Sequence, residues 1–262
     1  MLTLLLYLVL GAVAGVLSGL FGIGGGLVIV PVLITTFGVL KMPGEIAVHM
    51  AIGTSLATIV VTSLSAIYNH NRRGNVDWSV VKRLVPGVLI GAYIGGFLAD
   101  RFPAQLLENL LAIFLIAVAL QMLFGVKPHP DRRLPGPAGI FASGGVIGTL
   151  SALFGIGGAT LSVPYLRWCS LAMNKAVGTS ATLALPVALG GVTSYIINGW
   201  DNLALPEWTL GYVYLPAFFG IVVASTQFVR FGAALGAKLS TVILQRSFAL
   251  FLLCLGGRLL LT

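Results

Sequence analysis

The apolar residues of this chain run in long unbroken stretches and do not alternate with polar ones. One example is the segment LLENLLAIFLIAVALQMLFG, which begins at Leu106. About twenty mostly apolar residues are what an α-helix needs to cross a bilayer. Strands of outer-membrane barrels instead alternate apolar and polar residues over about ten positions. The pattern therefore predicts an all-α polytopic membrane protein.

Eight apolar stretches are long enough, or nearly so, to cross as helices: residues 3–20, 46–68, 79–99, 106–124, 138–153, 176–198, 209–228 and 246–262. Two further apolar segments, 26–37 and 159–170, are too short to span as independent helices. Each follows a glycine cluster, FGIGGG at 21–26 and FGIGG at 154–158. We therefore expect eight full spans and two short glycine-broken arms. Whether the arms span the bilayer or re-enter it stays open.

The glycine clusters belong to an internal repeat. The segment SGLFGIGGGLVIVPVLI from Ser18 corresponds to SALFGIGGATLSVPYLR from Ser151, and AIGTSLAT from Ala51 corresponds to AVGTSATL from Ala176. Internal repeats of this size are typical of transporter folds. We expect a first transmembrane repeat at 1–124, a proline-rich cytoplasmic linker at 125–137 and a second transmembrane repeat at 138–262.

The basic residues indicate how the repeats are oriented. Only 8% of the residues are charged, whereas soluble domains have roughly 25%. If the chain reverses at each glycine cluster, twelve of the 15 basic residues lie on one side and only Lys41, Arg101 and Arg258 on the other. Without the reversals the division is eight against seven. Because cytoplasmic loops are enriched in Lys and Arg, we expect two inverted repeats of about five helical segments each, with both termini outside.

The glycine clusters are the first candidate site. Irregular backbone inside a bilayer must face protein or a water-filled cavity, and the N-terminus of a helix attracts anions through its unpaired N–H groups. A pseudo-twofold axis would bring the two clusters together around one anion. The candidate substrate-binding glycines are Gly22, Gly24, Gly25, Gly26, Gly155, Gly157 and Gly158. Glycines spaced four apart, as in GAVAGVLSG from Gly11 and at Gly91 and Gly95, are instead typical of close helix packing.

Hydroxyl groups at matching positions of the two repeats are the second candidate site. Thr54, Ser55, Thr179 and Ser180 lie in the two GTS motifs and are candidates for binding substrate or an ion. The alternative is that they bond back to their own helix carbonyls. A further set is considered for coupling or gating because its members flank these motifs: Ser18, His49, Ser151, Arg167, Asn174 and Lys175.

The acidic residues exclude some chemistry by their positions. All seven lie in loops or at predicted helix ends, whereas ion pathways usually place ionisable groups within the membrane. A carboxylate site for cations is therefore disfavoured, and H⁺ or Na⁺ remain open as coupling ions. Cys169 and Cys254 lack metal-ligand spacing, so we expect neither a metal nor a cofactor. The chain also lacks HExxH and Walker motifs, and we do not expect an enzyme.

The paired segments GLFGIGGGLVIVPVL and ALFGIGGATLSVPYL, each followed by a GTS helix, resemble the TauE/SafE sulfite exporter family, also called the 4-toluene sulfonate uptake permease family. The likeness extends over nearly the whole chain. It implies a multi-pass inner-membrane secondary transporter that works by alternating access. Its cargo would be a small sulfur-containing anion such as sulfite, sulfoacetate or another organosulfonate.

The family motifs fall on the glycine clusters with Pro31 and Pro164, and on the two GTS motifs. One departure is Ala159, which stands where the first repeat has Gly26. We expect a small anion and membrane lipid as partners and no nucleic acid, while a homodimer stays open. A passive anion channel and a non-transporting membrane scaffold are the alternatives.

Overall fold

The computed structural model describes residues 2–21, 25–124, 134–236 and 241–261. In this part of the chain a helix lies at each of the ten predicted segments: α1 Leu2–Phe21, α2 Gly26–Val39, α3 Gly44–Arg72, α4 Trp78–Arg101, α5 Ala104–Phe124, α6 Pro137–Leu153, α7 Ala159–Trp168, α8 Met173–Gly199, α9 Leu215–Gly236 and α10 Thr241–Leu261. Among the described residues, five helices are long and apolar enough to cross a membrane: α3, α4, α5, α8 and α9. The chain is a mostly helical polytopic membrane protein.

The predicted bounds of the span at 209–228 are wrong, since its helix starts later and runs on to Gly236, and the following helix begins at Thr241 and not at 246. The span expected to begin at residue 209 begins at Leu215, because residues 209–214 form an antiparallel hairpin of β1 (Thr209–Leu210) and β2 (Val213–Tyr214). Gly211 occupies the turn with φ of +53°, a conformation that glycine adopts without steric cost. Pro216 then lies in the first turn of α9, where a missing N–H costs nothing.

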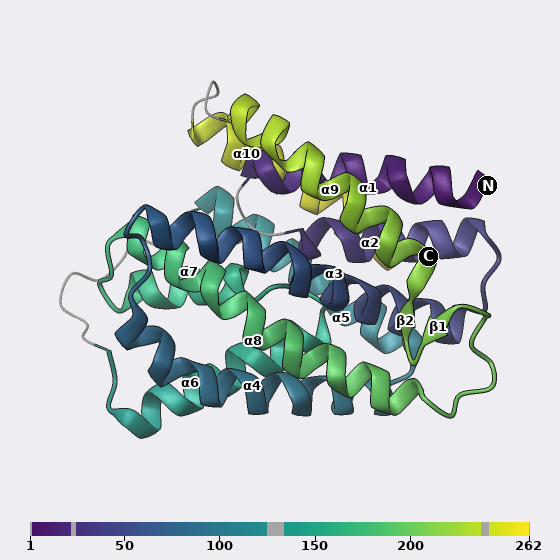
Figure 1. The fold of residues 1–262 in the computed structure, drawn as a ribbon, viewed down its shortest axis with the longest axis horizontal. Helices are drawn as coiled ribbons and strands as arrows, with labels where there is room; N and C mark the ends of the chain where they lie inside the picture. Colours follow the sequence, from purple (N-terminus) through teal and green to yellow (C-terminus); the bar gives the residue numbers. More distant parts are fainter. Residues whose placement is uncertain (1, 22–24, 125–133, 237–240, 262) are drawn as a thin grey trace.

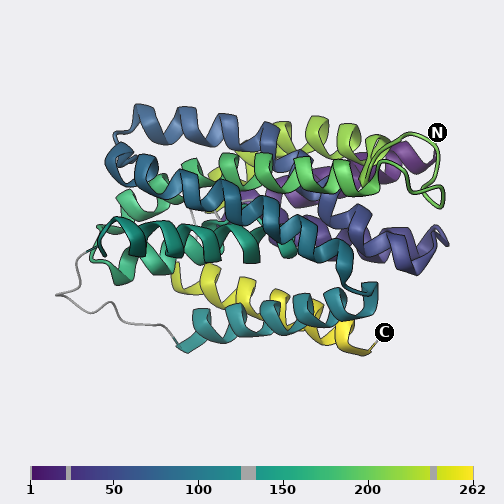
Figure 2. The ribbon, with the colours of Figure 1, turned by 90° about the horizontal axis from the view of Figure 1, so that it is seen from below.

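The helices run roughly along the longest axis of the molecule, and both termini lie at the same end as the β1–β2 hairpin (Figures 1 and 2). The α3–α4 connection lies at the opposite end. In Figure 1, α1 begins and α2 ends at the end with the termini, whereas α6 begins and α7 ends at the other end. The chain therefore changes direction between α1 and α2 and again between α6 and α7, in opposite senses.

Glycines allow two pairs of helices to pack at backbone distance. α1 packs along α9, and α6 packs along α4. A Cβ atom at Gly11 would lie 2.7 Å from Ile221 Cα, and one at Gly15 would lie 2.7 Å from Ser225 Cα. Gly91 and Gly95 face the α6 backbone just as closely, at Gly145 and Thr149. The packing role predicted for these four glycines is confirmed.

Exposed aromatic residues mark both ends of the bundle. Tyr68, Trp78 and Trp168 are exposed near the connections that follow α3 and α7, whereas Trp200 and Trp208 are exposed in the segment that leads to the hairpin at the other end. Trp and Tyr concentrate at the two membrane–water interfaces. This distribution agrees with a membrane normal that runs along the long axis of the molecule.

Candidate functional site

The two glycine segments meet inside the bundle. Gly26 is the first residue of α2, and a Cβ atom there would lie 2.6 Å from the Gly155 carbonyl oxygen and 2.9 Å from Ile156 Cα. Only glycine permits this approach of one backbone to another. Gly22 and Gly24, which we also predicted as binding residues, lie outside the described residues.

The second glycine segment needs glycine for its conformation. Gly155 and Gly158 have φ angles of +66° and +73°, which L side chains rarely adopt. Gly158 is also the N-cap of α7. In the first arm the corresponding N-cap, Gly25, has ordinary right-handed helical angles. The two arms are therefore similar in position but differ in backbone conformation.

The start of α7 offers free hydrogen-bond donors. Within the described residues, the N–H groups of Gly157, Gly158, Ala159 and Thr160 have no acceptor. The Ser151 hydroxyl lies beside them, 3.5 Å from where a Cβ atom of Gly158 would be. It is fully buried and has no hydrogen-bond partner in the part of the chain that the structure describes. Unpaired amides at a helix N-terminus favour negative charge. The arrangement can therefore bind an anion.

The first arm repeats part of this arrangement. A Cβ atom at Gly25 would lie 4.0 Å from the Ser18 hydroxyl oxygen. Ser18 and Ser151, predicted from their symmetric positions in the sequence, thus each lie beside the N-terminus of the arm that follows them. The structure brings both residues to the glycine segments.

The hydroxyls of the GTS motifs connect the two halves of the chain. Thr54 Oγ1 accepts a hydrogen bond from the Tyr214 N–H at 2.9 Å, and Thr179 Oγ1 accepts one from the Asp77 N–H at 3.0 Å. Each threonine therefore binds the residue at the entry of a helix in the other half, α9 or α4. Back-bonding within the helix occurs instead at Thr58 and Thr182.

The two GTS serines differ. Ser55 donates to the Gly155 carbonyl at 2.8 Å, which fastens α3 to the second glycine segment. Ser180 is fully buried, and its hydroxyl has no hydrogen-bond partner among the residues that the structure describes. A buried hydroxyl without a hydrogen-bond partner costs about 1–3 kcal/mol. A ligand that bonded to the Ser180 hydroxyl would remove this cost.

Apolar side chains close the site. Ile59 and Ala184 lie against Gly157, where a Cβ atom would be 3.5 Å and 3.4 Å from them, and they form a small buried cluster with Ala188. Residues 151–158 are all buried. The second glycine segment is therefore shielded from solvent in this conformation.

Comparison with known proteins identifies the family. The family model described as Sulfite exporter TauE/SafE matches residues 7–259. The chain belongs to the TauE/SafE sulfite exporter family. A relative from Haemophilus influenzae, named probable membrane transporter protein, is 36% identical over 251 residues, which cover 95% of each chain.

More distant relatives carry the same description. A probable membrane transporter protein from Methanocaldococcus jannaschii is 29% identical over 246 residues, covering 92% of this chain and 89% of the relative. One from Bacillus subtilis is 29% identical over 280 residues, covering 99% and 98%. TauE/SafE is a family of membrane transporters, which places the chain among transporters and not among enzymes.

Three of the predicted gating residues lie away from the glycine segments of this TauE/SafE protein. The Arg167 guanidinium donates to the Leu171 carbonyl at 2.9 Å, and Lys175 Nζ donates to the Val76 carbonyl at 3.4 Å. Asn174 is exposed at the start of α8. Arg167 lies in the last turn of α7, the second arm itself, nine residues after Gly158, and Lys175 bonds to the α3–α4 connection. They lie at helix connections near the end of the bundle opposite the termini.

Sequence reasoning missed Asp77, which caps α4. Its carboxylate accepts hydrogen bonds from the Ser79 hydroxyl at 2.6 Å and from the N–H groups of Ser79 and Val80. The Ser79 hydroxyl, with smaller contributions from these amides and from Lys175, lowers the pKa of the Asp77 carboxyl. The sequence could have predicted this cap, because Asp77 directly precedes an apolar helix and aspartate is a favourable N-cap residue.

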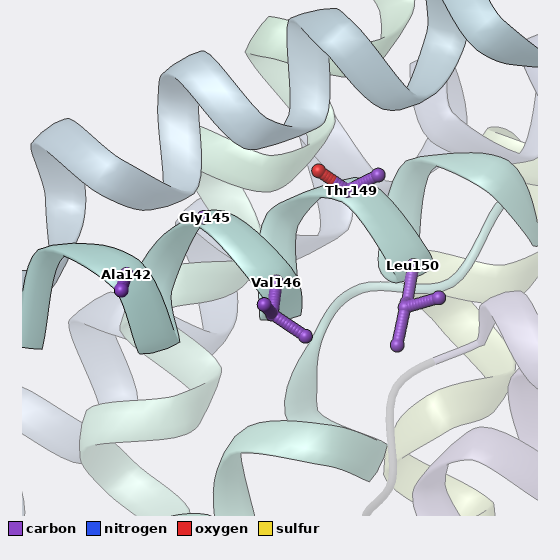
Figure 3. Close-up of a pocket in the computed structure, with 5 residues that line it drawn as sticks. All are labelled: Ala142, Gly145, Val146, Thr149 and Leu150. Carbon is purple, nitrogen blue, oxygen red and sulfur yellow. The ribbon is translucent and has the colours of Figure 1, made fainter. Parts of the chain in front are cut away.

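A shallow groove on α6 is separate from this site. It has a volume of about 400 Å³ and is lined by Ala142, Gly145, Val146, Thr149 and Leu150 (Figure 3). The Thr149 hydroxyl is already used, because it donates to the Gly91 carbonyl of α4 at 3.0 Å. An open hollow with this apolar lining suits contact with lipid and not with an anion.

Proposed function

We propose that this TauE/SafE protein is a secondary transporter of small sulfur-containing anions, such as sulfite, sulfoacetate or other organosulfonates. The anion binds between the two glycine segments and is exposed alternately to the two sides of the inner membrane. The observation that carries the proposal is the start of α7, where four amides and the buried Ser151 hydroxyl lie together and have no hydrogen-bond partner among the described residues. The name of the family, sulfite exporter, supports the substrate class.

The chemistry of the site suits an oxyanion held by neutral groups. Sulfite and sulfonate oxygens accept several hydrogen bonds at once, and amides and hydroxyls can supply them. Thr54 and Thr179 already accept one bond each, but their own hydroxyl protons have no acceptor among the described residues. Binding by dipoles without a fixed cation leaves the anion easier to release than an ion pair would, which a carrier needs.

The arrangement of contacts supports inverted repeats and alternating access. α1 packs on α9 as α6 packs on α4, and the Thr54–Tyr214 bond corresponds to the Thr179–Asp77 bond when the two halves are exchanged. In transporters built from inverted repeats, exchanging the conformations of the halves moves the opening from one side to the other. The closed site described above corresponds to an intermediate in this cycle.

Transport assays test the proposal directly. Purified protein in liposomes would be offered radiolabelled sulfite, sulfoacetate, taurine and thiosulfate, with counterflow as the readout. A carrier accelerates entry of label when unlabelled substrate is inside, whereas a channel does not. Entry of labelled anion without counterflow would favour the passive channel. No flux of any of these anions would favour the scaffold.

Two substitutions test where the anion binds. Gly25→Val and Gly157→Val place side chains at the two arms, and we expect both to abolish counterflow while the protein still inserts and purifies as a monodisperse species. Gly38→Ala is a matched control, because a Cβ atom there meets nothing within 4 Å. Normal transport by both valine variants would contradict the proposed site.

A further inference from the structure

His49 lies between two carbonyl groups that can only accept hydrogen bonds. Its Nδ1 is 3.1 Å from the Glu45 carbonyl oxygen and its Nε2 is 3.0 Å from the Ala99 carbonyl oxygen. A neutral imidazole carries one N–H, so one of its nitrogens would turn a lone pair toward an oxygen. Only the imidazolium form donates from both nitrogens. The geometry therefore fits a histidine that holds two protons.

The surroundings of His49 also favour a cation. The Tyr212 ring lies tilted against the imidazole, with a centroid distance of 5.2 Å and an interplanar angle of 30°, and an aromatic face attracts a cation. The Tyr212 hydroxyl donates to the Asp100 carboxylate at 3.0 Å. Asp100 has no basic partner among the described residues, so its negative charge is left to act on this cluster.

The other titratable groups around the cluster are few. Glu45 is exposed one turn before His49 on the same helix, and α5, which also packs on α3, carries Glu108 in its second turn. On α8, Tyr195 is buried with its ring centroid 6.2 Å from that of Tyr212, and its hydroxyl has no partner in the described residues. On α4, Arg101 follows Asp100, is exposed, and has its guanidinium carbon 4.8 Å from the Phe97 ring centroid.

The segment 212–214, which ends the β1–β2 hairpin, contacts both His49 and the first GTS motif. The Tyr212 ring lies against His49, a Cβ atom at Gly53 would lie 2.8 Å from the Tyr212 carbonyl oxygen, and the Tyr214 N–H donates to Thr54. His49 precedes Thr54 by five residues, which is about 7.5 Å along a helix. A change in the protonation of His49 is therefore placed to shift the segment that binds the GTS threonine.

Among the described residues this cluster exists in the first repeat only. The residue that matches His49 in the second repeat is Asn174, which is exposed, and Asn75 takes the place of Tyr212 against the second GTS motif at Gly178. Neither asparagine can take up a proton. The two halves thus share the glycine arms and the threonine contacts but not the titratable group.

Building on the proposed transport function, we infer that His49 is the proton-binding site that couples anion transport to H⁺. In this conformation His49 is protonated and bridges the Glu45 and Ala99 carbonyls. When Ala99 and Tyr212 move away from α3, His49 releases its proton to the side that has opened. The proton moves in the same direction as the anion, so the charge carried across the membrane is reduced.

The test measures proton and anion movement together. Liposomes that contain the protein and an entrapped pH-sensitive dye would receive the radiolabelled anion that gives the strongest counterflow. We expect anion entry to acidify the lumen, and we expect His49→Gln to lower the number of protons moved per anion toward zero, whatever rate remains. Glutamine still donates to a carbonyl but does not titrate. His70→Gln, at the far end of α3, should leave the ratio unchanged.

Direct observation of the ring keeps the inference testable if His49→Gln does not transport. In protein with ¹⁵N-labelled histidine and with His70 and His129 replaced by glutamine, we expect both ring nitrogens of His49 to show the chemical shifts of an imidazolium at the pH of the assay.

A neutral His49 ring would overturn the inference, as would an unchanged proton-to-anion ratio in His49→Gln. Anion counterflow without proton movement in the unmodified protein would also overturn it and would leave the transport proposal standing. Absence of counterflow would contradict the transport proposal itself.

Discussion

At the scale of residues, the most informative contacts are the hydrogen bonds from the GTS threonines to the opposite half of the chain. Thr54 and Thr179 are fully buried and each satisfies a backbone N–H, of Tyr214 and of Asp77. Replacing such an acceptor leaves a buried donor unpaired. The threonines therefore hold the two halves together, in addition to any contact that they make with substrate.

We predict that Thr54→Val and Thr179→Val each lower the free energy of unfolding by about 1–3 kcal/mol, because valine keeps the shape but cannot accept the bond. Thermal unfolding in detergent would measure this. Thr58→Val and Thr182→Val are matched controls, since those hydroxyls bond only to their own helix. Equal losses in all four variants would contradict a special role of the GTS threonines.

The Asp77 cap predicts a pH dependence. Because hydrogen bonds from Ser79 and Val80 lower the pKa of Asp77 in the folded state, its stabilising effect is complete above the unfolded pKa of about 3.9 and is lost as the pH falls through the lower folded value. Asp77→Ala should cost about 1 kcal/mol near neutral pH. The difference from the unmodified protein should shrink in acid, as measured by unfolding over a pH series. A constant difference at all pH values would contradict the cap.

At the scale of elements, the two arms share a sequence motif but differ in how closely the first residue of the helix packs on the other half of the chain. Gly26 must be glycine because it touches the Gly155 carbonyl, whereas the corresponding Ala159 is accepted at the start of α7. The departure noted in the sequence thus has a structural reason. It lies in the packing of the first arm on the second, because a methyl group at position 26 would meet the Gly155 carbonyl.

We predict that Gly26→Ala destabilises the protein and lowers transport, because its Cβ atom would lie 2.6 Å from a carbonyl oxygen of the other half. Ala159→Gly, the reciprocal change, should cost no more than a glycine near a helix N-terminus, below about 1 kcal/mol. Unfolding in detergent and counterflow would be measured for both. If Gly26→Ala were as stable as the unmodified protein, the close contact between the arms would be wrong.

At the scale of the whole molecule, both termini and the hairpin lie at one end of the bundle, and the α3–α4 connection, rich in basic residues, lies at the other (Figure 1). By the rule that basic loops stay in the cytoplasm, we predict that the end with the termini faces outward.

Cysteine labelling checks the orientation. In a background without Cys169 and Cys254, Leu203→Cys near the hairpin should react with a membrane-impermeant maleimide from outside the cell. Arg73→Cys, in the α3–α4 connection, should react only after permeabilisation. Both positions are exposed, so access to the reagent depends on the membrane alone. Labelling of Arg73→Cys in intact cells would contradict the predicted topology.

The sequence by itself determined the places of the ten helical segments, the matching of motifs between the halves and the family. These follow from local properties: the length of an apolar run, the breaking of a helix by clustered glycines and the repetition of a motif. The close packing at Gly11 and Gly91 was also predictable, because small residues spaced four apart form one face of a helix.

Only the tertiary structure decided which groups meet. The bond from Tyr214 to Thr54 joins residues 160 positions apart, and the bond from Asp77 to Thr179 joins residues 102 apart. Likewise, His49 gains its second acceptor from α4 and its aromatic neighbour from the hairpin. Such contacts depend on how helices cross and on where a loop folds back, and no local pattern of residues encodes either. For that reason the glycine arms could be predicted from the sequence, whereas the contacts around His49 could not.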